Sequence, residues 1–99
     1  MAEAILTIRN PSGLHARPAA TFVRAATGYA AEVRVTNLSS DPDRSASGKS
    51  LLAVLGLGCG RGSRVRLEAT GEDAEAAVRA LADLIEAGLG EASGSVETE

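Results

Sequence analysis

The chain is poor in aromatic residues: of its 99 residues, one is phenylalanine, one is tyrosine and none is tryptophan. Hydrophobic residues nevertheless make up 44% and charged residues 23%, which are values typical of a globular protein and not of a disordered chain. The core must therefore be built from Ala, Val, Leu and Ile. This length predicts one domain, which can bury such a core but not a deep substrate cavity as well.

Cysteine, long apolar runs and clustered positive charge are also scarce. Cys59 is the only cysteine, so the chain cannot form an internal disulfide, which fits a protein of a reducing compartment. We expect Cys59 to be simply a small residue near the core. No stretch approaches the roughly 20 apolar residues of a membrane helix, and we find no signal peptide. The net charge is −3 and the arginines are scattered, which argues against nucleic-acid binding. These features predict a cytoplasmic protein with neither a nucleic-acid nor a membrane partner.

The hydrophobic pattern predicts alternating strands and helices. Three segments alternate like half-buried strands: residues 4–8, 32–36 and 64–69. One helix is predicted to begin near residue 16, with Pro18 in its first turn and Gly28 just past its end. A second follows residues 70–73, where a threonine with an acid three residues later resembles a capping box.

Two segments are less regular. Residues 37–47 predict a turn-rich loop with a short strand near residues 44–46. Residues 50–57 form a compact apolar run that fits either a short buried helix or a strand. The predicted order is therefore βαββαβα, an α+β fold with an antiparallel sheet and helices on one face, because the connections are too short for a purely parallel sheet. We expect one domain over residues 1–90 and a frayed tail over residues 91–99.

The only histidine, His15, lies where the first strand gives way to the first helix. The free amides of Ala16 and Arg17 and the helix dipole favour an anion there. A neutral imidazole can act as a nucleophile, and the Arg17 guanidinium can hold phosphate oxygens. The alternative is that His15 is a turn residue of the N-cap type and Arg17 a solvated charge. No metal-binding cluster accompanies His15 in the sequence, and no cofactor is implied.

The segment Asn10-Pro11-Ser12-Gly13-Leu14-His15-Ala16-Arg17-Pro18-Ala19-Ala20 resembles the active-site motif of the HPr family, the histidine phosphocarriers of the bacterial phosphoenolpyruvate-dependent sugar phosphotransferase system. Three further segments resemble the family's regulatory-serine region, its glycine turn with the last strand, and its final helix: residues 48–52, 58–67 and 72–87. The match covers roughly residues 3–90. The loop at residues 37–47 is longer than in the family, and the residues after Gly90 are extra.

The resemblance implies a four-stranded antiparallel sheet with three helices on one side. It also implies that enzyme I phosphorylates His15 on Nδ1 and that IIA domains of sugar permeases receive the phosphoryl group. Such a carrier relays phosphate between proteins and is not an independent enzyme.

Ser50 precedes the apolar run and is a candidate helix cap. In some members of the family the matching serine is phosphorylated by a dedicated kinase, so regulatory phosphorylation is a second role for Ser50. Within the run, Leu51, Val54 and Leu55 are candidate partner-binding residues. Leu51 and Val54 are the residues expected to remain exposed beside His15, unless the run is entirely core. Ala20 and Arg24, one and two turns beyond Ala16, extend the same patch.

Three functions remain open at this point. The first is the phosphocarrier. The second is a regulatory module that binds a transcription regulator through its serine, as in relatives that lack the histidine. The third is a small phosphatase, which would need a second catalytic group near His15. The presence of both His15 and Arg17 favours the first.

Overall fold

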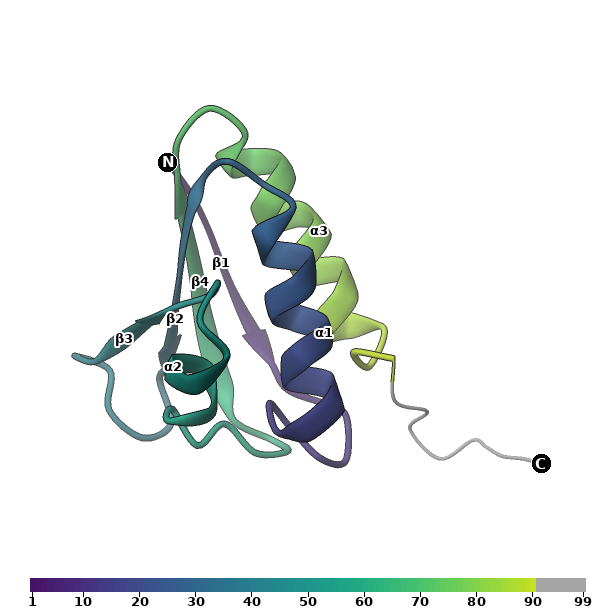
Figure 1. Cartoon of the computed structure of the whole chain (residues 1–99). Coiled ribbons are helices and arrows are strands. Elements are labelled where there is room, and N and C mark those ends of the chain that lie inside the picture. The colour runs from purple at the N-terminus through teal and green to yellow at the C-terminus, as the bar shows by residue number, and fades with distance from the viewer. Residues whose placement is uncertain (91–99) are drawn as a thin grey trace.

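The computed structural model describes residues 1–90, and the tail predicted for residues 91–99 lies outside the described residues. The elements follow the predicted order (Figure 1): β1 (Ala2–Thr7), α1 (Ala16–Thr27), β2 (Glu32–Asn37), β3 (Ser45–Ser47), α2 (Leu51–Leu55), β4 (Arg64–Thr70) and α3 (Ala74–Glu86). The apolar run after Ser50 is therefore a short helix, and the short strand lies one residue later than predicted.

The four strands form one antiparallel sheet in the order β1-β4-β2-β3. β4 is central: its Leu67 lies opposite Ala4 of β1 and Val35 of β2. Figure 1 shows α1, α2 and α3 gathered over one face of this sheet. The predicted α+β fold is confirmed.

The core lies between the sheet and the helices and contains one aromatic ring. Val33, Val35 and Leu67 are at most 1% exposed and point inward from their strands. Phe22 of α1 is fully buried opposite them. Alternation along β2 and β4 thus leaves the other face of the sheet with polar side chains such as Arg34.

The capping box predicted at residues 70–73 is wrong. Thr70 is the last residue of β4, and the side chain of Asp73, which immediately precedes α3, makes no cap hydrogen bond. Its carboxylate instead accepts hydrogen bonds from the amides of Ala30 and Ala31, at 2.9 and 2.7 Å. Two charge-assisted bonds to a neighbouring turn are stronger than one bond to the helix end.

Candidate functional site

The loop after β1 is shaped by backbone hydrogen bonds and one glycine. The side chain of Asn10 is buried and donates to the carbonyl oxygen of Gly13 at 2.9 Å. Gly13 has φ of +63°, and a Cβ atom there would lie 2.4 Å from the carbonyl oxygen of Cys59. Leu14 is fully buried, and its amide donates to the same oxygen at 2.8 Å. The loop is thus pressed against residues 59–60.

His15 follows this anchored loop and occupies the N-cap position of α1. Its backbone is extended, with φ of −131° and ψ of 156°, and its side chain is exposed and makes no cap hydrogen bond. The first hydrogen bond of α1 runs from the amide of Ala19 to the His15 carbonyl oxygen, at 3.5 Å. His15 therefore occupies the N-cap position, but its ring does not cap the helix.

Ala16 has φ of +52°, in the left-handed region that residues with a side chain rarely adopt. Backbone strain of this kind persists only where the surrounding structure enforces it, and it is concentrated at functional sites. Here Leu14 on one side and Pro18 on the other are both buried and hold the chain in place. The strain lies between the imidazole of His15 and the guanidinium of Arg17.

The amides of Ala16 and Arg17 precede the first helical hydrogen bond of α1. Such amides have no partner within the helix and carry the positive end of its dipole. The first turn of α1 contains no acidic residue, and the one basic residue of its last turn is Arg24. The local charge therefore favours an anion beside His15.

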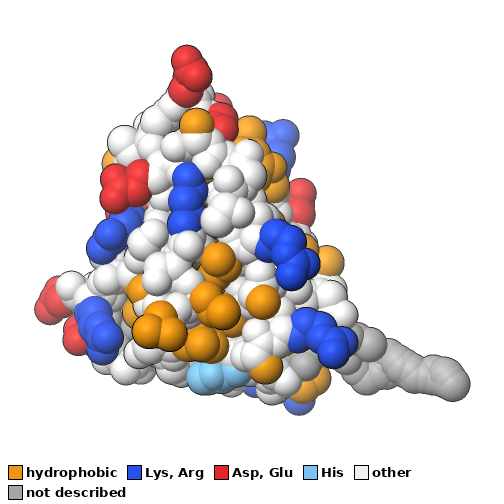
Figure 2. Space-filling view, viewed as in Figure 1, with side chains coloured by type: hydrophobic (Ala, Val, Ile, Leu, Met, Phe, Trp, Pro, Cys, Tyr) orange, Lys and Arg blue, Asp and Glu red, His pale blue; other side chains and the backbone are white. Residues whose placement is uncertain are grey.

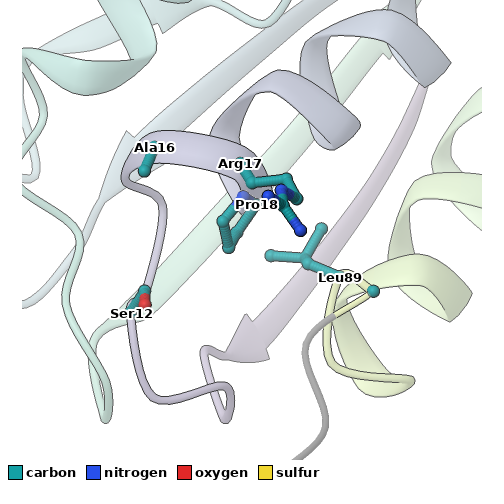
Figure 3. Close-up of a pocket in the computed structure, with 6 residues that line it drawn as sticks. Ser12, Ala16, Arg17, Pro18 and Leu89 are labelled. Atoms are coloured by element: carbon teal, nitrogen blue, oxygen red, sulfur yellow. The ribbon is translucent and has the colours of Figure 1, made fainter.

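Arg17 is exposed and lines a pocket of about 220 Å³, together with Ser12, Ala16, Pro18, Leu89 and Gly90. Figure 3 shows the Arg17 side chain extending toward Leu89, beyond the end of α3. His15 is not part of the pocket lining. The predicted phosphate-binding residues, Ala16 and Arg17, thus lie together, with His15 directly next to them in the chain. Sequence reasoning missed Leu89 and Gly90 as residues of this pocket.

Ser50 caps α2, as one of its two predicted roles requires. Its Oγ accepts a hydrogen bond from the amide of Ala53 at 3.2 Å, and its own amide donates to Ser47 at 3.2 Å. The residue is half-buried. Capping leaves its second predicted role, as a phosphorylation site, open.

A polar clamp that sequence reasoning missed lies beside Ser50. Lys49 donates from Nζ to the carbonyl oxygen of Tyr29, at 2.6 Å. The neighbouring Asp73 has a lowered pKa, chiefly because the amide of Ala30 donates to its carboxylate, with smaller contributions from Ala31 and from the positive charge of Lys49. The clamp joins the start of α2, the end of α1 and the start of α3.

The apolar residues of α2 that are exposed and those that are buried differ from the ones predicted. Leu51 is 41% exposed, as expected, but Val54 is fully buried, so its predicted exposure is wrong. Leu52, which was not selected, is 82% exposed. A helix of five residues presents one position directly to the core, and Val54 takes it, one turn before the buried Leu57.

The other predicted partner-binding residues come from α1 and α2, two helices that are in contact with each other. Leu55 and Ala20 are half-buried, and Arg24 is exposed. Figure 2 shows an apolar patch next to the pale blue histidine. The residues predicted for docking, apart from Val54, are thus accessible at least in part.

Cys59 is buried, and burial raises the pKa of its thiol to about 11. A thiol with so high a pKa is a poor nucleophile. Among residues 1–90, no cluster of three or more His, Cys, Asp or Glu side chains is placed to hold a metal ion. Over the same residues, no helix is long and apolar enough to cross a membrane.

The fold and the motif around His15 together define the class of small phosphocarrier domains. The family model described as "PTS HPr component phosphorylation site" matches residues 2–87, and the chain belongs to the HPr family. A phosphocarrier protein HPr from Streptomyces coelicolor is 44% identical over 91 residues, covering 92% of this chain and 95% of that protein. A phosphocarrier protein HPr from Haloferax volcanii is 45% identical over 83 residues, covering 84% of this chain and 91% of that protein.

Longer proteins and solved structures are also similar. The multiphosphoryl transfer protein of Salmonella typhimurium is 45% identical over 89 residues, which are 90% of this chain but 23% of that protein. The chain therefore spans about a quarter of such relatives. A crystal structure of HPr-C-His from Thermoanaerobacter tengcongensis has a TM-score of 0.84 at 40% identity and covers 92% of this chain and 98% of that one.

Proposed function

We propose that this HPr-family protein accepts a phosphoryl group on His15 from enzyme I and passes it to IIA domains of sugar permeases. The observation that carries the proposal is the exposed His15 ring, which makes no cap hydrogen bond at the start of a helix whose first amides have no helical partner. The family match supports the class of reaction, and the named donor and acceptors belong to the proposal.

In the proposed reaction a ring nitrogen of His15 attacks the phosphorus of the group carried by the donor. The bond from nitrogen to phosphorus forms as the donor's bond breaks, and the reverse step on an acceptor returns His15 to its starting state. The protein supplies positioning and charge, because phosphoryl transfer needs little other chemistry from it. The Arg17 guanidinium and the amides of Ala16 and Arg17 would stabilise the phosphoryl oxygens.

Incubating the chain with phosphoenolpyruvate and enzyme I tests the proposal. We expect a mass gain of one phosphate that is labile in acid and stable in base. His15→Ala should abolish the gain while leaving the fold intact, because the side chain is exposed and its ring makes no cap hydrogen bond. Ser50→Ala should keep the gain and is the matched control. Phosphorylation of the His15→Ala variant would show that the site is elsewhere, and release of free phosphate without an adduct would indicate a phosphatase.

A second role at Ser50 is part of the proposal. The residue is half-buried at the start of α2, beside the exposed Leu51 and Leu52. A structure of Crh, named as the Bacillus subtilis catabolite repression HPr, shares 30% identity with this chain at a TM-score of 0.62. Phosphorylation of Ser50 by a serine kinase would allow a regulatory function through a transcription regulator. Mass spectrometry of the protein from its own cells, with Ser50→Ala as control, tests this role.

A further inference from the structure

The face of the sheet that points away from the helices has no function in the reaction described above. Within residues 1–90, all three helices lie on the other face, as Figure 1 shows. Every second side chain of β1 and β4 points away from the helices, because the residues between them pack in or against the core. These outward residues, here called the open face, are Glu3, Ile5 and Thr7 on β1 and Arg64, Arg66 and Glu68 on β4.

The charges of the open face are separated along the strands. Glu3 lies directly opposite Glu68, so one end of the face carries two carboxylates. Arg64 precedes Glu68 by four residues on β4 and therefore lies at the other end, about 13 Å away. The row between the two ends pairs Ile5 with Arg66. The open face thus has an acidic end, a basic end and one large apolar side chain between them.

The side chains of this face are available for further contacts. Arg64 is exposed and forms no ion pair with any other of residues 1–90. Glu68 has a partner in Arg66, with 3.5 Å between Oε1 and Nε, but a carboxylate can accept from a second guanidinium as well. Ile5 is 47% exposed, although large apolar side chains are stabilised by removal from water. A partner for this face should therefore offer a carboxylate, a guanidinium and an apolar side chain in the reverse order.

A second copy of the chain offers that order when it is turned end for end. A half-turn about an axis that runs across the strands, through the row of Ile5, brings the acidic end of one copy over the basic end of the other. Arg64 of each copy then faces Glu68 of the other copy, and the two Ile5 side chains meet near the axis. The two Arg66 side chains also approach the axis, and each keeps Glu68 of its own chain as a counter-charge.

We propose that the open face is the interface of a symmetric dimer, in which two sheets pack face to face and two equivalent ion pairs join Arg64 to Glu68. The helices lie on the outer sides of such a dimer, so the exposed leucines of α2 and the start of α1 remain accessible in both copies. The inference therefore goes beyond the proposed phosphoryl transfer and does not depend on it. Because four short strands offer little area, we expect a weak dimer with a dissociation constant on the order of 10⁻⁴ M.

Sedimentation of the full chain at concentrations up to about 1 mM measures the association. We expect the dimer to weaken as salt rises, because exposed ion pairs are screened. Arg64→Glu should weaken it in low salt by about tenfold or more, since like charges then face each other twice. Arg79→Glu is the matched control: it makes the same change of charge at an exposed arginine of α3 and should leave the association unchanged.

A mixture of two variants separates specific pairing from an effect of net charge. Glu68→Arg alone should also weaken the dimer, because it places two arginines opposite each other. Mixing Glu68→Arg with Arg64→Glu creates both ion pairs again in a heterodimer, with the charges exchanged, so association should return to nearly the original strength. Thermal unfolding of each variant checks that it is folded.

NMR of the unaltered chain gives a measurement that needs no variant. On dilution, the amide signals of Ile5 and Arg66 should move, whereas those of His15 and Leu52 should not. A chain that stays monomeric up to about 1 mM would overturn the inference. So would equal weakening by Arg64→Glu and Arg79→Glu, folded variants that do not associate when mixed, or dilution shifts confined to α1 and α2.

Discussion

The amide of Leu14 donates to the carbonyl oxygen of Cys59, so the residue before the candidate nucleophile is tied to a loop 45 positions later in the chain. The contact uses backbone atoms on both sides, and Gly13 makes it possible by leaving no Cβ atom in the way. The position of His15 therefore depends on close approach of two loops and not on a side-chain network.

Gly13→Ala should destabilise the protein by at least about 2 kcal/mol, because it adds a Cβ atom to a backbone with positive φ and pushes it against Cys59 and Gly60. Urea unfolding measures the loss. Gly60→Ala is the control: a Cβ atom there meets nothing within 4 Å. Equal stability of the two variants would contradict the close packing of the loops.

Arg17→Ala should slow phosphoryl transfer by on the order of 10²–10³ while leaving affinity for enzyme I nearly unchanged, because the guanidinium stabilises charge that develops on the moving group. Rapid-quench measurements at saturating enzyme I separate the rate from binding. Arg79→Ala, an exposed charge lost from α3, is the control. A variant that transfers at the normal rate would remove Arg17 from the reaction.

Ser50→Asp should weaken association with enzyme I in low salt, and the effect should fade in high salt. Aspartate still caps a helix but adds a negative charge beside the exposed Leu51 and Leu52. Ser50→Asn, which caps without charge, is the matched control in a calorimetric titration. Equal affinity of the two variants in low salt would place Ser50 outside the docking surface.

Leu52→Ala and Val54→Ala should have opposite consequences. Leu52 is 82% exposed, so its truncation should weaken partner docking with little change in stability; Val54 is fully buried, so its truncation should cost about 2 kcal/mol of folding free energy. Thermal unfolding and a binding titration on both variants check this. A stability loss in Leu52→Ala as large as that in Val54→Ala would contradict the burial pattern.

Asp73 should contribute to acid lability. Its pKa in the folded state is below the ordinary value of 3.8, so the unfolded state binds the proton more readily. The stabilisation is complete above that ordinary value and is lost as the pH falls through the lower folded pKa. Asp73→Asn should therefore flatten the fall in unfolding free energy below about pH 4, measured by urea titration. Asp83→Asn, an exposed carboxylate on α3, should leave the profile unchanged.

Local pattern was sufficient to predict most elements. Alternation indicated β1, β2 and β4 within one or two residues, and the proline at position 18 with the glycine at position 28 gave the extent of α1. The run after Ser50 was ambiguous because five to eight apolar residues suit a strand or a helix equally. Its exposed leucines could not be assigned correctly until the orientation of a helix one turn long was known.

Contacts between segments that are distant in the chain could not be predicted from the sequence. Asp73 bonds to amides 42 and 43 positions earlier, and Lys49 to a carbonyl 20 positions earlier. The pattern of residues 70–73 predicted a capping box, in which Asp73 would bond to the backbone of Thr70, and so it favoured the wrong partner. The pocket beside Arg17 likewise needs Leu89, whose place is set by packing of the whole of α3.

The direction of β1 has an engineering consequence. Its first residue, Ala2, and its last, Thr7, are separated by about 17 Å, five steps of an extended chain. The N-terminus therefore lies at the end of the sheet opposite the His15 loop, as Figure 1 shows. A protein joined ahead of Ala2 would leave the end of the molecule that carries His15 unobstructed, so this unit is suited to work as one module in a fused chain.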